Sequence, residues 1–450
     1  MATAGSSFAR WAMGCIGFGV APAADDDPLF DWLVDHAAEL RTLDAADDDF
    51  ADLEPLAAAI GDARVVQLGE QSHGDGATFL AKTRLIRFLH ERLGFDVLAF
   101  ESGLYDCAVA EAQLADPKVA ALAACEQGLF GIWTQSEACQ PLFHWLKATH
   151  VTAQPLELAG VDCQFTGLAS GGYVDALAAA AREHGVALAE EDLARVRGAY
   201  ARLARGGGPA PSQGAAAQKD ESAELLVPLF EELERRFTKA DGAADAAARQ
   251  RRFFARTLRN FRIQMRVAEL FGSGKSEDQL EASNLRDIAM GENLVWLVRE
   301  RYPGRKVIVW AASRHIAHDL ATLAFPDGSR GYARMVTMGD IVHRELGDAA
   351  YTLLFTAARG RHGSALGSAA SVLAEPGAAM LEAQLDRIAP LAFVDLRAAR
   401  NDPDSPARHP VCARPFGYAP QIGDWSAVAD GFLFTAEMTP SLPRAAAARR

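Results

Sequence analysis

The sequence has no apolar segment long enough to cross a bilayer and no excess of positive charge. Its 45 lysine and arginine residues are outnumbered by 59 aspartate and glutamate residues, which gives a net charge of −14. An acidic protein of this kind is a poor partner for nucleic acid or for an anionic membrane surface. We therefore expect no nucleic-acid partner and no membrane insertion.

Cysteine is also scarce, with six residues in 450 and no C-x-x-C or zinc-ribbon spacing among them. Six cysteines in a chain of this length are too few for a fold that depends on disulfide bonds. We expect six buried thiols. The alternative, for an exported protein, is a disulfide between Cys125 and Cys139.

Motifs for nucleotide binding and for serine hydrolases are missing as well. No G-x-G-x-x-G follows an expected strand, and no G-x-x-x-x-G-K-[ST] loop occurs. We therefore expect a protein without a cofactor. The absence of a G-x-S-x-G turn weighs against a serine hydrolase.

Residues 1–30 form a leader of ambiguous type. Arg10 precedes the apolar run 11–20, and Ala21-Pro22-Ala23 then places small residues before three aspartates. This order resembles a short signal peptide. If residues 1–23 act as one, the protein is exported to the periplasm; otherwise the leader is disordered or mis-started and the protein is cytoplasmic.

Strand patterns recur at wide intervals, and helical patterns fill most of the gaps between them. The expected strands are residues 64–68, 96–101, 155–161, 306–311, 333–338, 351–356 and 390–396, and residues 31–60 have a helical pattern. Strands that alternate with helices indicate an α/β fold with a mainly parallel sheet flanked by helices.

The widest gap between expected strands contains only helical patterns. The expected helices there are residues 172–185, 190–205, 219–241, 243–271 and 277–301, with a glycine- and proline-rich loop at 206–211. We interpret residues 166–302 as a helical insertion that forms a cap on one α/β domain, residues 31–440, which a C-terminal tail, 441–450, follows.

Polar side chains follow four of the expected strands. Glu70 and His73 come after the run 65–68, and Glu101 ends the next strand; the helical pattern 77–94 joins the two, so we expect parallel neighbours. Asp162 and His315 follow two later strands. The carboxyl ends of parallel strands share one edge of the sheet, where α/β proteins bind ligands.

Two chemistries suit these side chains. Neutral His73 can take a proton from water while Glu70 or Glu101 orients the imidazole or the water, and His315 can stabilise an oxyanion or protonate a leaving alcohol. The same residues are also plausible ligands for zinc, manganese or iron. Asp162 alone could simply cap the turn that follows it.

The helical pattern 243–271 carries a stripe of arginines. They lie at positions 249, 252, 256, 259, 262 and 266. Such a stripe either lines a cleft for an anionic or carbonyl-rich ligand or forms a solvated face that pairs with nearby Glu and Asp. The second interpretation is the favoured one.

The segments 69–74, G-E-Q-S-H-G, and 94–101, G-F-D-V-L-A-F-E, resemble the erythromycin esterase family. The resemblance runs from about residue 60 to residue 435. It continues at Trp133-Thr134, Glu137, Trp145-Leu146, Gly160-Val161-Asp162, Arg286-Asp287, Met290, Glu292-Asn293, Trp296-Leu297, Trp310-Ala311, Met338-Gly339, Leu346-Gly347, Tyr351, Asp395-Leu396-Arg397, Arg414 and Gly417-Tyr418. It implies an erythromycin esterase-like fold and metal-independent hydrolysis of a macrolide lactone. In that reaction His73 is the base, Glu70 and Glu101 are site carboxylates, and His315 has a site role.

The sequence departs from the family at several site positions. The family's W-A-H-N-x-H segment has Ala312 and Ser313 in place of its first histidine and its asparagine, and Arg314 lies beside the site. The family's site arginine corresponds to Lys82 or Arg84. At the position after the first motif where the family often has an acidic residue, this sequence has Ala77.

These observations predict a hydrolase of a small-molecule ester or lactone, macrolide-like or different. Its expected catalytic residues are His73, Glu70, Glu101 and His315. Its expected substrate-binding residues are Arg84, Trp133, Asp162 and Arg314. The alternatives are a metal-dependent hydrolase that uses the same residues and a non-catalytic ligand-binding protein that lacks a catalytic partner at Ala312.

Overall fold

The structure is a computed structural model and describes residues 27–206, 221–238, 246–364 and 367–444. Nearly all of the expected leader, most of the loop 206–211 and most of the expected tail lie outside these ranges. Within them, no helix is both long enough and apolar enough to pass through a membrane.

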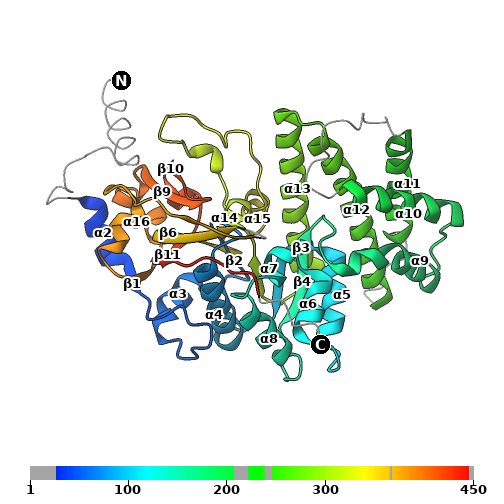
Figure 1. The fold of residues 1–450 in the computed structure, drawn as a ribbon, viewed down its shortest axis with the longest axis horizontal. Helices are drawn as coiled ribbons and strands as arrows, with labels where there is room; N and C mark the ends of the chain where they lie inside the picture. Colours follow the sequence, from blue (N-terminus) through cyan, green and yellow to red (C-terminus); the bar gives the residue numbers. More distant parts are fainter. Residues whose placement is uncertain (1–26, 207–220, 239–245, 365–366, 445–450) are drawn as a thin grey trace.

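A nine-stranded, mainly parallel sheet runs through the middle of the protein (Figure 1). Its order is β1-β8-β11-β6-β2-β5-β3-β4, with β7 paired to β6 alone. The pairs of β8 with β1 and with β11, and the pair β6–β7, are antiparallel; the others are parallel. The strands are β1 Ala37–Glu39, β2 Val65–Leu68, β3 Val97–Gly103, β4 Glu157–Asp162, β5 Val307–Trp310, β6 Ala350–Ser364, β7 Gly367–Val372, β8 Leu391–Asp395 and β11 Gly431–Met438. The expected fold class is confirmed.

Helices cover both faces of this sheet. Side chains of α3, α4 and α8 pack on one face, and those of α13, α14 and α15 pack on the other. The helices outside the β4–β5 connection are α2 Pro28–His36, α3 Glu54–Ile60, α4 Gly76–Leu93, α5 Leu104–Leu114, α6 Ala121–Gly128, α7 Gly131–Thr134, α8 Gln140–Thr149, α14 Ser313–Ile316, α15 Met338–Leu346, α16 Leu381–Asp386 and α17 Arg397–Asn401. A separate hairpin consists of β9 Val411–Phe416 and β10 Ala419–Gly423.

The connection from β4 to β5 is helical, as expected, and lies beyond the β4 edge of the sheet (Figure 1). It contains α9 Tyr173–Glu183, α10 Glu190–Gly206, α11 Glu221–Thr238, α12 Ala246–Gly272 and α13 Ser276–Trp296, which continues as a π-helical turn, Leu297–Arg301.

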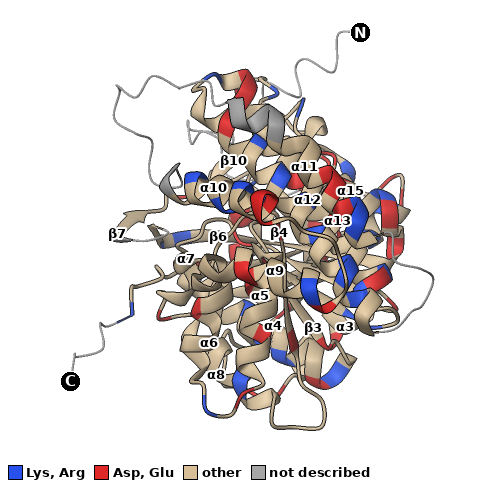
Figure 2. Ribbon diagram, turned by 90° about the vertical axis from the view of Figure 1, so that its right-hand side faces the viewer, with Lys and Arg blue, Asp and Glu red and all other residues tan. Residues whose placement is uncertain are grey.

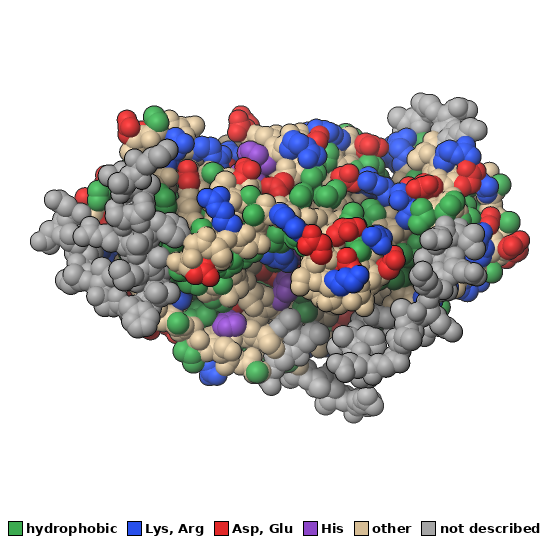
Figure 3. Space-filling model, turned by 90° about the horizontal axis from the view of Figure 1, so that it is seen from above, with side chains coloured by type: hydrophobic (Ala, Val, Ile, Leu, Met, Phe, Trp, Pro, Cys, Tyr) green, Lys and Arg blue, Asp and Glu red, His purple; other side chains and the backbone are tan. Residues whose placement is uncertain are grey.

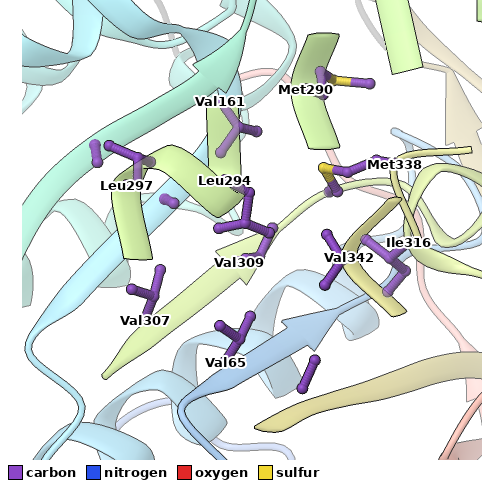
Figure 4. Packing of buried hydrophobic residues seen from close by; sticks show 14 of the residues in the cluster. Val65, Val161, Met290, Leu294, Leu297, Val307, Val309, Ile316, Met338 and Val342 are labelled. Atoms are coloured by element: carbon purple, nitrogen blue, oxygen red, sulfur yellow. The ribbon is translucent and has the colours of Figure 1, made fainter. Parts of the chain in front are cut away.

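Helix α13 is anchored to the sheet by an apolar contact (Figure 4). Leu294 lies beside Val309 of β5, and Met290 and Val161 of β4 belong to the same buried cluster. Burying an aliphatic side chain of this size contributes about 1.5–3 kcal/mol. The anchor fixes the polar residues that lie one turn earlier on α13 against the ends of the strands.

The expected adjacency of β2 and β3 is wrong. Both are parallel members of the sheet, but β5 lies between them and pairs with each. A β-α-β pattern fixes the direction of two strands and not the number of strands between them. β5 is as apolar and as fully buried as its neighbours, so it fills the gap when the chain returns from the helical connection.

Two other expectations about secondary structure are wrong. Residues 333–337 form no strand, and helix α15 begins at Met338. Thr337 and Asp340 form a reciprocal capping box that starts this helix. The helical pattern 31–60 is interrupted after His36 by β1 and a loop. Strands β1, β7, β9, β10 and β11 were not expected.

Four of the six cysteines are confirmed as buried thiols. They are Cys107, Cys125, Cys139 and Cys163, so Cys125 and Cys139 do not pair. The expectation is wrong for Cys412, which is disulfide-bonded.

The arginine stripe on α12 pairs with neighbouring acids, as the favoured interpretation had it. Figure 2 shows basic and acidic residues intermingled on α12 and α13. The ion pairs are Arg252–Glu300, Arg259–Glu292, Arg262–Glu234 and Arg266–Glu281. Arg256 and Arg259 also line a cavity of about 300 Å³, whose walls include three glutamates.

Candidate active site

Glu70 and His73 lie on the turn that joins β2 to α4. The Nδ1–H of His73 donates a hydrogen bond of 2.6 Å to Oε1 of Glu70. The Glu70 side chain is fully buried, whereas that of His73 is 33% exposed. Among the described residues, Nε2 of His73 has no hydrogen-bond partner. The imidazole is therefore oriented by one nitrogen and open at the other.

Glu70 is held by two further donors. The Nζ of Lys82 lies 2.8 Å from Oε2, and the indole N–H of Trp133 lies 3.3 Å from Oε1. The Lys82 ammonium also lies 3.9 Å from the ring centroid of Trp310, a cation–π contact. Burial raises the pKa of Glu70, but Lys82 and His73 outweigh it and hold that pKa below its usual value. Glu70 is thus a carboxylate.

The pKa of His73 is raised by the same contact. Burial opposes the charged imidazolium, but the hydrogen bond and the negative charge of Glu70 outweigh it, so the pKa of His73 lies above 6.5. The fraction of His73 that is neutral, and so able to accept a proton, therefore increases as the pH rises through the pKa of His73.

Glu101 and His315 form a second, mostly buried group, whose side chains are paired with one another and with α13. Oε1 of Glu101 lies 3.3 Å from Nε2 of His315, and Oε2 accepts the backbone N–H of Ala312 at 2.9 Å. Nδ1 of His315 lies 2.7 Å from Oδ1 of Asp287. Arg286 donates to Oε1 of Glu101 at 2.9 Å. Both nitrogens of His315 thus contact carboxylates.

These contacts set the charges of the second group. Burial lowers the pKa of His315, but Asp287 and Glu101 outweigh it and raise that pKa to about 9. Burial likewise acts against ionised Glu101, yet His315 and Arg286 hold the pKa of Glu101 well below its usual range. At neutral pH, His315 is an imidazolium between carboxylates.

The two groups lie at the same end of the sheet and influence each other. The charge of Glu101 raises the pKa of His73, and that of His315 lowers it. The backbone joins the groups as well, because the N–H of Ser313 donates to the Glu70 carbonyl at 2.9 Å. Figure 3 shows a hollow near the middle of one face where histidine, basic and acidic side chains lie together.

The expected substrate-binding residues lie in different places. Trp133 and Asp162 contact the two groups described above: Trp133 donates to Glu70, and Asp162 accepts hydrogen bonds from Nε and Nη2 of Arg286. Arg314 is half-buried on α14 and, within the described part of the chain, has no hydrogen bond or ion pair.

The structure does not bring Arg84 to the Glu70–His73 group or to the Glu101–His315 group. Its guanidinium binds Asp52 at 2.6 Å and the carbonyl of Asp49 at 2.7 Å, on the loop before α3. Two residues apart on a helix, side chains point to different sides. Lys82, on the other side of α4, is the cation at Glu70.

Sequence reasoning missed the site contacts of Arg286 and Asp287. Both lie on α13, where Arg286 contacts Glu101 and Asp287 contacts His315, and no local pattern links the two pairs. The signal that the sequence did hold was the family resemblance, which includes Arg286-Asp287. In the structure Asp287 is buried, and a buried carboxylate requires a partner.

The donor set does not resemble a metal centre. In the ranges that the structure describes, no three His, Cys, Asp or Glu side chains are grouped so that they could hold a metal ion. The carboxylates instead accept from Lys82, Arg286 and the two histidines.

Comparisons with known proteins agree with this fold. The sequence model of the erythromycin esterase family matches residues 90–434. YbfO of Bacillus subtilis (strain 168), a provisionally named hydrolase, is 25% identical over 449 residues, which cover 94% of each chain. Erythromycin esterase type II of Escherichia coli is 44% identical over 73 residues, or 16% of this chain and 17% of that protein.

Three solved structures have the same fold. A Bacillus cereus protein matches with a TM-score of 0.71 and 15% identity, covering 93% of this chain and 98% of its own. A succinoglycan biosynthesis protein matches with a TM-score of 0.70 and 17% identity, covering 92% and 97%. A mutant of the erythromycin esterase EreC in its open conformation matches with a TM-score of 0.64 and 18% identity, covering 90% and 98%.

Proposed function

Because this chain belongs to the erythromycin esterase family, we propose that it hydrolyses an ester or lactone bond with water activated by His73. Family membership and the full-length relative YbfO both point to a hydrolase. The observation that carries the finer proposal is the pair of His73 and Glu70, with one imidazole nitrogen held at 2.6 Å and the other open.

In the proposed reaction, Nε2 of neutral His73 takes a proton from a water molecule as the water attacks the substrate carbonyl. Glu70 keeps the tautomer that has its proton on Nδ1 and stabilises the imidazolium that forms. Lys82 and Trp133 hold Glu70 in place. The tetrahedral intermediate then breaks the bond to the alkoxide, which receives the proton from His73.

The second group supplies positive charge for the oxyanion. His315 remains charged at neutral pH because its pKa is about 9. Its contact with Glu101, at 3.3 Å, is longer than its contact with Asp287, at 2.7 Å. The substrate oxygen takes the place of the longer contact. Charge that is fixed in advance around a developing oxyanion is among the largest contributions to catalysis.

Arg314 is the proposed contact for a substrate oxygen outside the reacting carbonyl. It is half-buried, next to His315 in sequence, and unpaired within the described ranges. Trp133 and Asp162 act by positioning Glu70 and Arg286. The proposed substrate is a small ester or lactone, macrolide-like or different, because Ala312 replaces a family histidine.

The test is a panel of macrolides, simple lactones and linear esters, read by mass spectrometry as the gain of one water. Wild type, His73→Ala and His36→Ala are compared, with folding checked by circular dichroism. His36 is a surface residue whose hydrogen bond and ring contact, within the described residues, are both with Trp32, so His36→Ala serves as the matched control. We expect wild type and the control to hydrolyse some member of the panel and His73→Ala to hydrolyse none. Full activity of folded His73→Ala refutes the role of His73.

Ala312 favours one alternative, a binding protein without turnover. Under that alternative, no member of the panel gains water, and one of them binds tightly to wild type in calorimetry.

A further inference from the structure

The turn that carries His73 is held by distant parts of the chain. The carbonyl of Gln71 accepts the N–H of Gly417, at the tip of the β9–β10 hairpin, at 2.9 Å. The carbonyl of Gly74 accepts the N–H groups of Gly363 at 2.8 Å and Ser441 at 2.7 Å. The geometry of the turn is therefore set by these three segments together with its own sequence.

The hairpin tip is a two-residue turn, which requires positive φ at both of its residues, and one of them is a tyrosine. Gly417 and Tyr418 both have φ near +61°. Asp319, at φ +52°, is the one other non-glycine residue with positive φ among those described. Aspartate tolerates this conformation because its side chain is short and polar, whereas a tyrosine there is strained. Such strain persists where the surroundings impose it, often at functional sites.

The tyrosine side chain lies beside Asp75, which belongs to the His73 turn. The Asp75 carboxyl is fully buried, and its Oδ2 accepts the backbone N–H of Ser72 at 3.0 Å. Oδ1 of Asp75 and the hydroxyl of Tyr418 are both buried, and neither has a geometrically defined hydrogen-bond partner in the described chain. Burial, chiefly, and the nearby Asp75 raise the pKa of Tyr418 well above its usual value, and Tyr418 in turn lowers the pKa of Asp75. The two side chains are therefore close enough to interact, and buried polar groups in native proteins are paired.

We propose that Tyr418 and Asp75 are positioning residues for His73. The hairpin tip accepts a strained backbone so that the Tyr418 hydroxyl meets the Asp75 carboxyl. Through Ser72 this contact fixes the turn in which His73 keeps its hydrogen bond to Glu70. The inference rests on the proposed role of His73 as the base.

The charges around Asp75 give this arrangement a pH dependence. Burial raises the pKa of Asp75 to about 8, so the carboxyl is neutral at pH 7. The groups that face it are Glu70 and His73 on its own turn and Tyr418 on the hairpin. Arg414 of β9 and His362 of β6 lie beyond the Tyr418 ring. Ionisation of Asp75 above about pH 8 places a second negative charge next to Glu70, and we expect this repulsion to outweigh the hydrogen bonds that Tyr418 and Ser72 donate to the ionised carboxyl and so to loosen the turn.

The first experiment separates positioning from stability. Tyr418→Phe keeps the ring and the backbone conformation and removes only the hydroxyl. We expect kcat to fall about tenfold because a small displacement of a catalytic group is costly, with KM and the melting temperature nearly unchanged. Asp319→Asn, at the other residue with positive φ, is the matched control and leaves kcat unchanged. A wild-type kcat in Tyr418→Phe overturns the inference.

The second experiment tests whether the carboxyl group of Asp75 acts in its neutral form. Asp75→Ala lowers kcat, and Asp75→Asn restores most of it because the amide imitates the neutral acid. Wild-type activity declines above about pH 8, and the decline is absent in Asp75→Asn. An alkaline limb shared by both proteins, or an Asn variant as impaired as the Ala variant, contradicts the inference.

A third measurement does not need turnover. The pKa of the His73 imidazole is followed by NMR, with His73→Ala to assign the signal. In wild type it lies above 6.5, and in Tyr418→Phe it falls toward 6.5 because the contact with Glu70 loosens. An unchanged pKa refutes the positioning role even if esters are hydrolysed. A lowered pKa in a protein that hydrolyses no ester supports positioning and refutes the proposed function.

Discussion

The two histidines of the cluster are held in opposite ways. His73 is 33% exposed and has one nitrogen engaged by a carboxylate, whereas His315 is 6% exposed and has both nitrogens engaged. The first arrangement suits a group that exchanges protons with solvent. The second suits a fixed charge. The difference shows how one sheet edge can tune the same side chain for two tasks, and the predictions below test it.

The largest effect is expected at Glu70, which orients His73 and pairs with Lys82. Glu70→Gln leaves Lys82 as an unpaired buried cation, and breaking a buried pair from one side costs about 3–5 kcal/mol. Denaturant unfolding should record this loss, and hydrolysis should fall by about 10²-fold or more. The double variant Glu70→Gln/Lys82→Met should recover stability without activity. If activity recovers too, Glu70 does not orient the base.

The second effect concerns His315 and is a change of stability with pH. Its pKa in the folded protein, about 9, lies above the ordinary value of 6.5. Its contribution is therefore fully present below pH 6.5 and is lost as the pH rises through about 9. This contribution is roughly 3 kcal/mol. We expect His315→Gln to be most destabilising at pH 6 and progressively less so toward pH 9, as measured by urea unfolding. A deficit that does not change with pH contradicts a charged His315.

The third effect separates Lys82 from Arg84. Arg84→Met removes charged hydrogen bonds to Asp52 and should cost about 1–3 kcal/mol of stability, with kcat/KM unchanged. Lys82→Met should lower activity, though less than Glu70→Gln does, because Glu70 then loses its counter-ion but keeps its contact with His73. Thermal unfolding and hydrolysis are measured on both variants. Equal losses of activity would place Arg84 in the site after all.

The smallest effect is a displacement of the acid limb of the pH–rate profile. Since Glu70 raises the pKa of His73, kcat/KM should rise with pH through a pKa above 6.5. The limb reports loss of a proton from the base, so activity is low below it and high above it. A limb at or below 6.5 indicates that the base is not paired with Glu70.

Much of the first group of residues was predictable from the sequence because its information is local. An apolar run that ends at Glu70, with His73 three residues later, is enough to place both at the end of a strand. The resemblance to the erythromycin esterase family rests on the same short segments, and the family is confirmed.

The second group was only half predictable because its contacts are not local. From α13, Asp287 reaches His315 and Arg286 reaches Glu101, and β5 enters between β2 and β3 after a connection of more than 100 residues. The error at residues 333–338 is different in kind. There the capping signal of Thr337 and Asp340 was visible in the sequence, but residues 333–338 were nevertheless expected to form a strand.

The hydrogen bonds that hold the His73 turn have a consequence for biosynthesis. The residues that hold it, Gly363, Gly417 and Ser441, emerge from the ribosome long after Glu70, His73 and Glu101. A nascent or prematurely terminated chain that ends before the β9–β10 hairpin possesses every proposed catalytic group but lacks Gly417 and Ser441, two of the three residues that hold the turn. Alignment of the proposed base therefore depends on the last part of the chain.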